Sequence, residues 1–174
     1  MASVSVAIDP SVAKILVVDD EPMILSVLKE QLQPEGFNAT FVDDASKALD
    51  ALKRESFSII LADHEMPGTT GLDLLAKVRE SYPHVIRLML SGKLGVKELL
   101  DAVQSGVIHR YLTKPWLREE LLVVLRNSVA RKVSESEITV SAGEGSAVDS
   151  VGEEATGASQ IIYSAEQAEA LVDA

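Results

Sequence analysis

Short apolar runs alternate with longer amphipathic segments over most of the chain. The short runs are rich in Val, Ile and Leu, which is typical of buried strands, whereas apolar residues recur every three or four positions in the longer segments, which is typical of helices. The predicted strands are residues 15–18, 37–42, 58–62, 85–90 and 107–112. A helical pattern follows each of them, beginning near Pro22, Ala45, Leu72, Val96 and Leu117. Five such units predict an α/β fold in which helices cover both faces of a parallel sheet.

Charge divides the chain into two unequal parts. The net charge is −11, yet all 16 Lys and Arg residues lie at or before Lys132, and residues 134–174 contain only acidic charges. We therefore predict a nearly neutral domain at 14–133, preceded by an extension at 1–13 and followed by an acidic, flexible tail at 134–174. The last residues of this tail, 164–174, have the pattern of a short helix. Without a basic face, direct binding of nucleic acid is not expected.

Other features of the composition indicate where the protein functions. No apolar run reaches the roughly 18–20 residues that a membrane-spanning helix needs, and residues 1–10 lack the pattern of a secretory signal. The chain has no cysteine, which rules out disulfides and fits a reducing compartment. We therefore expect a cytoplasmic protein that does not insert into a membrane.

Chemically active side chains follow four of the predicted strands. They are Asp19, Asp20 and Glu21 after the first strand, Asp63 after the third, Ser91 after the fourth, and Lys114 with Pro115 after the fifth. In an open parallel sheet, ligands bind at the carboxyl ends of the strands, so these groups should converge there. Taken singly, each has an ordinary structural interpretation, such as a helix cap, a turn or a loop. Their combination at one edge indicates a site.

The residue types at this edge suit phosphoryl chemistry. Clustered carboxylates repel one another unless a cation neutralises them, and Mg²⁺, or Mn²⁺ in its place, prefers oxygen ligands such as Asp19, Asp20 and Asp63. A carboxylate such as Asp63 can also act as a nucleophile and form an acyl phosphate. Lys114 would offset charge on the transferring phosphoryl group, and the hydroxyl of Ser91 could donate a hydrogen bond to it.

At these residues the sequence resembles the receiver domain of two-component response regulators, over about residues 14–132. The resemblance is carried by VVDDE at 17–21, DHEMPG at 63–68, LSG at 90–92 and YLTKPW at 111–116. It implies a doubly wound, flavodoxin-like fold with strand order 2-1-3-4-5. It also implies a signalling domain rather than an enzyme, with self-phosphorylation and slow autodephosphorylation as its only reactions.

The resemblance further implies roles for individual residues. A sensor histidine kinase or a phosphotransfer protein would phosphorylate Asp63, and the metal ligands would be Asp19, Asp20, Asp63 and the backbone carbonyl of Glu65. Ser91 and Lys114 would sense the phosphoryl group, Tyr111 would be the aromatic switch, and the peptide bond before Pro115 would be cis. The face made by the fourth helix, fifth strand and fifth helix would then change and control a partner or homodimerisation.

Two residues are expected at the entrance to the site. Glu65 and Lys93 carry opposite charges, and we hypothesise that they form an ion pair that slows the attack of water on phosphorylated Asp63.

Two alternatives keep the fold and change the function. A pseudo-receiver would use it as a constitutive protein-interaction domain, although the acidic set, Ser91 and Lys114 argue against this. A phosphohydrolase with an aspartyl nucleophile would be expected to carry a second Asp two residues after Asp63, where Glu65 stands, and a cap domain that the sequence lacks.

Overall fold

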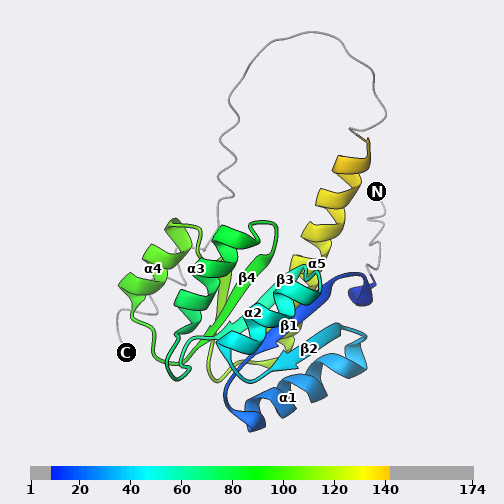
Figure 1. Ribbon diagram of the computed structural model, residues 1–174. Helices are drawn as coiled ribbons and strands as arrows, with labels where there is room; N and C mark the ends of the chain where they lie inside the picture. Colours follow the sequence, from blue (N-terminus) through cyan, green and yellow to red (C-terminus); the bar gives the residue numbers. More distant parts are fainter. Residues whose placement is uncertain (1–8, 142–174) are drawn as a thin grey trace, which may run out of the picture. The chain divides into compact units, whose positions relative to one another are not determined.

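The computed structural model describes residues 9–141, which belong to a compact unit, Met1–Gly143 (Figure 1). Most of the predicted acidic tail, including the helix at 164–174, lies outside the described residues, as do the first eight residues of the predicted extension. No helix in the described part is long and apolar enough to span a membrane.

The strands form one parallel sheet with the predicted order. They are β1 (Lys14–Val18), β2 (Asn38–Val42), β3 (Ile59–Asp63), β4 (Ile86–Ser91) and β5 (Arg110–Thr113). Their order across the sheet is β2-β1-β3-β4-β5, and every neighbouring pair is parallel. The doubly wound α/β fold is therefore confirmed, with β1 and β3 at its centre.

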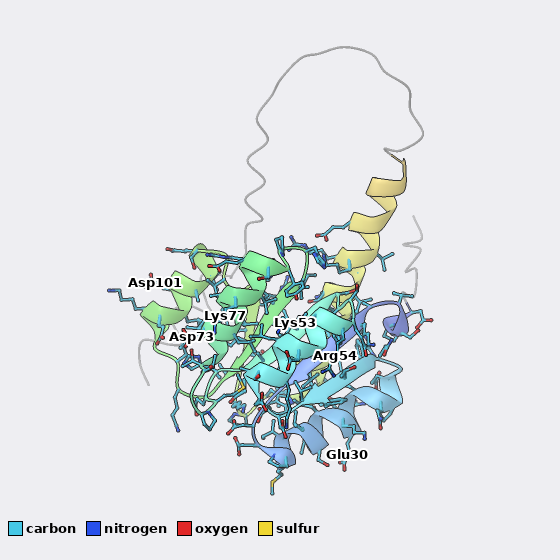
Figure 2. The ribbon with its side chains drawn as sticks, viewed as in Figure 1. Glu30, Lys53, Arg54, Asp73, Lys77 and Asp101 are labelled. Atoms are coloured by element: carbon cyan, nitrogen blue, oxygen red, sulfur yellow. The ribbon has the colours of Figure 1, made fainter. Side chains whose placement is uncertain are left out.

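Helices cover both faces of this sheet. They are α1 (Pro22–Leu32), α2 (Ala45–Arg54), α3 (Gly71–Ser81), α4 (Val96–Gln104) and α5 (Arg118–Ser141), with short 3₁₀ turns η1 (Pro10–Val12) and η2 (Gln33–Glu35). Because strand side chains alternate between faces, Ile15 and Val17 join the core beneath α1 and α5, whereas Leu16 and Val18 join the core beneath α2, α3 and α4. Charged residues such as Glu30, Lys77 and Asp101 lie on the outer sides of these helices (Figure 2).

The ends of some elements differ from the predicted ones. β3 and β4 each run one residue further, so that Asp63 and Ser91 are the last residues of their strands. β5 begins only at Arg110, because the backbone before it still belongs to the end of α4: Gly106 adopts a positive φ of 71° and the Ile108 amide donates to the Ala102 carbonyl. α5 continues past Val133 to Ser141. The domain boundary at residue 133 stays a prediction.

A buried arginine in β4 is a feature that the apolar pattern concealed. Arg87 is only 4% exposed, and its guanidinium donates hydrogen bonds to backbone carbonyls rather than to a carboxylate. The acceptors are the carbonyls of Pro83, Val85, Gly106 and Val107. Arg87 therefore joins the α3–β4 connection to the α4–β5 connection, and its four acceptors offset part of the cost of burying a cation.

The backbone of the same residue depends on a histidine. The Arg87 amide donates to His109 Nδ1 at 3.0 Å, which requires this nitrogen to be unprotonated. Burial, followed by the nearby charge of Arg87, lowers the pKa of His109 from 6.5 to about 4. Between about pH 4 and pH 6.5, His109 binds a proton in the unfolded chain more readily than in the folded chain. The contribution of neutral His109 to stability is therefore complete above pH 6.5 and is lost as the pH falls toward 4.

We expect acidification from pH 7 to pH 4.5 to lower the free energy of unfolding by about 1–2 kcal/mol more in the wild type than in a His109→Asn variant. The asparagine carbonyl can accept the same hydrogen bond without titrating. The measurement is urea unfolding of both proteins at the two pH values, since carboxylates elsewhere contribute equally to both. If acidification lowered the free energy of unfolding equally in both proteins, neutral His109 would not stabilise the fold.

Candidate functional site

The topology brings the predicted residues to one edge of the sheet. Val18 pairs with Ala62 across the central strands, so Asp19 and Asp63 follow as neighbours at the carboxyl ends of β1 and β3. Asp63 itself pairs with Leu90, which places Ser91 one residue further along β4. Lys114 lies just beyond the end of β5.

Three carboxylates form the centre of the site. Oxygen atoms of Asp19, Asp20 and Asp63 all lie within 4.8 Å of one another. Asp19 is fully buried and Asp63 is 1% exposed, whereas Asp20 is half-buried. Such a cluster is electrostatically costly unless cations approach it.

Lys114 supplies one of these cations. Its Nζ lies 2.8 Å from Asp19 Oδ2 and 2.8 Å from Asp63 Oδ1. Burial lowers the pKa of Lys114, but its contacts with the two carboxylates outweigh this effect, so the net pKa is raised and the side chain is an ammonium ion. Burial also raises the pKa of Asp19, even though the hydrogen bond from Lys114 opposes that change. One ammonium ion thus faces three carboxyl groups.

Backbone amides orient two of the carboxylates and leave other oxygens without donors. Asp19 Oδ1 accepts from the Glu21 amide at 2.9 Å, and Asp63 Oδ2 accepts from the Glu65 amide at 3.0 Å. Asp20 Oδ1 and Asp63 Oδ1 are buried and accept no hydrogen bond, although Lys114 lies beside the latter. Buried oxygens without donors, grouped in an excess of negative charge, fit a hard divalent cation such as Mg²⁺.

The hydroxyl and the aromatic residue lie on the α4 side of this cluster. Ser91 is 7% exposed, and its Oγ accepts from the amides of Lys93 at 3.3 Å and Leu94 at 3.1 Å. Tyr111 is partly buried and packs against the core beneath α2, α3 and α4. The connection between β4 and α4 is therefore joined to the site through one hydroxyl oxygen.

Glu65 and Lys93, which follow Asp63 and Ser91 by two residues, form an ion pair. Lys93 Nζ lies 3.4 Å from Glu65 Oε2, and their side chains are 83% and 37% exposed. An ion pair this exposed contributes little to stability, so its effect on the site would be local.

The connection after β5 is anchored to α1. The peptide bond between Lys114 and Pro115 is cis. The indole Nε1–H of Trp116 donates to Gln31 Oε1 at 3.0 Å. Beside this contact lies a groove of about 450 Å³, whose lining also includes Ile24, Val27 and Pro115.

Sequence analysis missed Gly71, which begins α3. A β-carbon at this position would lie 2.2 Å from the carbonyl oxygen of Asp63 and 2.7 Å from the Cα of His64, so α3 can approach the end of β3 only with glycine there. Thr70 caps the helix by accepting from the Asp73 amide, and Asp73 reaches back to the Thr70 amide. The spacing of Thr70 and Asp73 is the signal from which this helix start could have been found.

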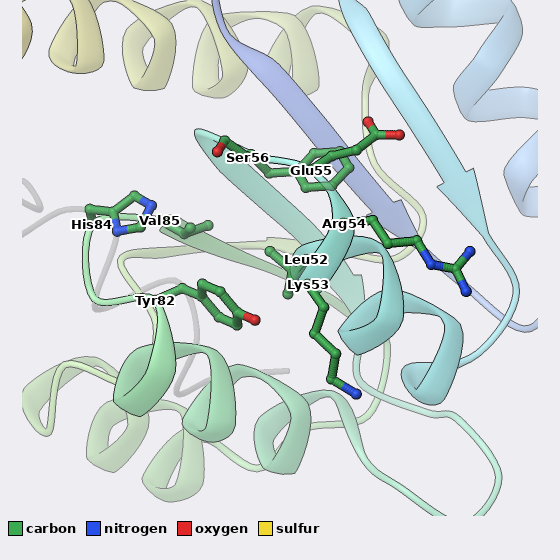
Figure 3. Close-up of a pocket in the computed structure, with 9 residues that line it drawn as sticks. Leu52, Lys53, Arg54, Glu55, Ser56, Tyr82, His84 and Val85 are labelled. Carbon is green, nitrogen blue, oxygen red and sulfur yellow. The ribbon is translucent and has the colours of Figure 1, made fainter.

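A second hollow lies at the opposite end of the sheet, before β3 and β4 (Figure 3). Its volume is about 240 Å³, and Phe57, Tyr82 and His84 are among its lining residues. Lys53 and Arg54 stand on its α2 side. None of the clustered carboxylates reaches it, so it is separate from the candidate site.

Comparisons with known proteins agree with this geometry. A family model described as the response regulator receiver domain matches residues 15–126. Chemotaxis protein CheY-3 of Vibrio cholerae is 36% identical over 115 residues, which cover 62% of this chain and 88% of that protein. The crystal structure of a signal receiver domain of an HD domain-containing protein from Pseudomonas fluorescens superposes with a TM-score of 0.68 at 32% identity, covering 78% of this chain and 98% of the other.

Longer regulators match only in part. The hydrogenase transcriptional regulatory protein HoxA of Cupriavidus necator is 36% identical over 117 residues, which cover 67% of this chain but 24% of that protein. The probable transcriptional regulatory protein TcrX of Mycobacterium tuberculosis is matched over 50% of its length. The chain thus spans a quarter to a half of these regulators. From the family match and the agreement in fold, the chain belongs to the response regulator receiver domain family of two-component signalling.

Proposed function

We propose that the protein accepts a phosphoryl group on Asp63 from a sensor histidine kinase or a phosphotransfer protein. The observation that carries the proposal is the state of the Asp63 carboxylate. It is buried, Oδ2 is held by the Glu65 amide, and Oδ1 accepts no hydrogen bond while lying 2.8 Å from Lys114 Nζ. One oxygen is thus fixed and the other is available as a nucleophile.

The transfer exchanges one bond to phosphorus for another. Asp63 Oδ1 forms a bond to phosphorus as the bond to the donor's imidazole nitrogen breaks, and the released imidazole takes a proton from solvent. Lys114, already beside Oδ1, offsets the charge of the phosphoryl oxygens. Mg²⁺ or Mn²⁺, held by Asp19, Asp20, Asp63 and the backbone carbonyl of Glu65, would supply further positive charge to the same oxygens.

The phosphoryl group would then act as a switch. The hydroxyl of Ser91 turns toward the phosphoryl oxygens, and Tyr111 follows it, so that the face formed by α4, β5 and α5 changes. That face would control a partner protein or the pairing of two copies of this chain. A domain of this kind transmits a signal and turns over phosphate only slowly, and direct binding of nucleic acid by this chain is not part of the proposal.

The test is to incubate the chain with acetyl phosphate and Mg²⁺ and to measure its intact mass. We expect one phosphoryl group on the wild type, lost when EDTA replaces Mg²⁺, and none on an Asp63→Asn variant. Size-exclusion chromatography of the same samples would show whether phosphorylation changes the oligomeric state. A wild type that stays unmodified would favour the alternative of a constitutive interaction domain.

Lys93→Ala should shorten the lifetime of phosphorylated Asp63 if, as we propose, the Lys93–Glu65 ion pair at 3.4 Å slows the approach of water to the acyl phosphate. An exposed ion pair contributes at most about 1 kcal/mol, so we expect at most a roughly fivefold faster loss of phosphate. The measurement is the decay of intact-mass signal after the donor is removed. Lys97→Ala, which removes an exposed cation from α4, serves as the control. If the lifetime were unchanged in Lys93→Ala, the ion pair would not slow the attack of water on phosphorylated Asp63.

A further inference from the structure

One edge of the sheet is open in the described part of the chain. β2 pairs with β1 on one side, and no described strand lies on its other side (Figure 1). The carbonyl of Val42 accepts from the Asp19 amide just beyond β1, so the backbone groups of Val42 and Thr40 point toward β1. Because backbone groups alternate in direction along a strand, the N–H and C=O groups of Ala39 and Phe41 point outward, where a further strand could bond to them.

The open edge of β2 lacks the features that usually keep such an edge unpaired. Residues 38–42 contain no charged side chain and no proline, and they include the β-branched residues Thr40 and Val42. An uncharged edge of this kind pairs readily with another strand unless something covers it. A segment that covers β2 is therefore expected.

The turn η1 places the beginning of the described chain beside this edge. η1 lies against α5 and β2, and Pro10 Cγ is 3.5 Å from the position that a β-carbon on Gly36 would occupy, two residues before β2. Asp9 caps the turn by accepting from the Ser11 amide at 2.9 Å, and its own backbone is extended, with φ −62° and ψ 115°. The chain therefore enters the turn at the amino end of β2.

The sequence before Asp9 has the pattern of a strand. Valine or isoleucine stands at positions 4, 6 and 8, and serine or alanine stands at positions 3, 5 and 7. This period of two, with β-branched residues on one face, is typical of a strand that buries that face. Residues 2–8 carry no charged side chain, and the stretch 4–8 is as long as β2.

We propose that residues 4–8 form a further strand, antiparallel to β2, on the open edge of the sheet of their own chain. The direction follows from the connection to η1: residue 8 must lie near the amino end of β2, so residue 4 lies near its carboxyl end. Antiparallel edge strands are common on otherwise parallel sheets. The inference goes beyond the proposed function, because no step of it depends on phosphorylation.

The contact between Pro10 and the start of β2 sets the register. Counting back from that contact places Val6 opposite Thr40 and Val4 opposite Val42. Val42 packs against the core beneath α2, α3 and α4, and residues opposite each other in an antiparallel pair share a face. The two added valines would thus extend this core at the edge of the sheet.

The same register bonds the outward-facing backbone groups of β2. Ala39 would exchange both of its hydrogen bonds with Ala7, and Phe41 would exchange both of its bonds with Ser5. The side chains of Ala39 and Phe41 pack against the other core, beneath α1 and α5, so the small residues of the added strand lie on that face. Apolar pattern and backbone pairing therefore agree on one alignment.

The first test uses the absence of cysteine from the sequence. A double variant, Val6→Cys with Thr40→Cys, places two thiols at a non-hydrogen-bonded pair, where the Cα atoms lie about 4.5 Å apart, within the range that a disulfide spans. We expect mild oxidation to close this disulfide within one chain, read as loss of free thiols from a protein that still migrates as a monomer on a non-reducing gel. The control, Ser5→Cys with Thr40→Cys, puts the thiols on opposite faces and should oxidise at least about tenfold more slowly.

Hydrogen–deuterium exchange, resolved by residue with NMR, is the second test. The amides of Ala39 and Phe41 face outward and that of Thr40 faces β1, so neighbouring residues report on the two sides of β2. We expect deletion of residues 2–7 to speed exchange at Ala39 and Phe41 by roughly fivefold or more, from the loss of one hydrogen bond each. The Thr40 amide should be unchanged, which also shows that the shortened chain is folded.

The outcomes decide for or against the added strand. Equal oxidation of the two cysteine pairs, or a disulfide that joins two chains, would overturn a strand formed by residues of the same chain. Equal exchange at Ala39 and Phe41 in the full and shortened chains would overturn it as well. Neither test contains a phosphoryl donor, so these results are independent of whether acetyl phosphate modifies Asp63.

Discussion

Replacing Asp20 with asparagine should make the metal-free protein more stable and, at the same time, weaken its binding of Mg²⁺ by at least about tenfold to a hundredfold. The two effects have one cause. The carboxylates of Asp19, Asp20 and Asp63 lie within 4.8 Å of one another, and Lys114 contacts only the other two. Asp20 contributes negative charge that, among the described residues, has no ion-pair partner of its own.

The size of the stabilisation follows from simple electrostatics. Two like charges at this separation repel by about 3 kcal/mol when the effective dielectric constant is about 20. Asp20 meets two carboxylates and one ammonium ion, so attraction to Lys114 cancels part of the repulsion. We expect a net increase of about 1–2 kcal/mol in the free energy of unfolding, and the neutral amide would coordinate a divalent cation less strongly than a carboxylate.

The measurement is urea unfolding in EDTA, with a titration of Mg²⁺ followed by fluorescence of Trp116, the single tryptophan, which lines the same groove as Lys114. Asp50→Asn is the matched control, because Asp50 is an exposed aspartate paired with Lys53 outside the site. Its stability should change by less than about 0.5 kcal/mol. If Asp20→Asn were less stable than wild type in EDTA, the repulsion assigned to the cluster would be absent.

The features of the site that sequence analysis predicted are those that depend on topology. Apolar strands separated by helices imply a parallel sheet, and a parallel sheet brings strand ends together. Asp19, Asp63, Ser91 and Lys114 could therefore be grouped from the pattern alone. The same reasoning could not give the hydrogen bonds of Ser91 or the contact of Trp116 with Gln31, because these depend on side-chain conformations.

Sequence analysis did not predict the role of Arg87, because this side chain bonds to backbone carbonyls and takes no part in the site. Arg87 stands in an apolar run, where it could be taken for a surface residue of a strand. It is in fact buried, and its guanidinium donates to carbonyls of two connections. Those bonds hold the backbone after α4, which is why β5 starts later than its apolar run. A single charged residue within an otherwise apolar strand was the signal from which a buried, hydrogen-bonded Arg87 could have been predicted.

Among single substitutions at the site, we expect Gly71→Ala to lower the free energy of unfolding the most, although it adds only one methyl group. That methyl would lie 2.2 Å from the Asp63 carbonyl oxygen and 2.9 Å from the Asp63 carbonyl carbon, and neither backbone atom can move aside cheaply. The hydrogen bond from the Gly71 amide to the His64 carbonyl ties the same two segments together. α3 must therefore shift away from β3, which weakens the packing of its buried Leu74 and Leu75 in the core and displaces Asp63.

We expect Gly71→Ala to lower the free energy of unfolding by about 2–4 kcal/mol and to abolish modification of Asp63 even where the variant remains folded. Urea unfolding and intact mass after incubation with acetyl phosphate measure the two effects. Gly95→Ala is the control, since no atom lies within 4 Å of a β-carbon there, and it should cost less than about 1 kcal/mol. Equal stabilities for the two variants would mean that α3 can retreat from β3 without loss. In that case β3 alone would position Asp63, and the close approach of α3 to β3 at Gly71 would not be needed.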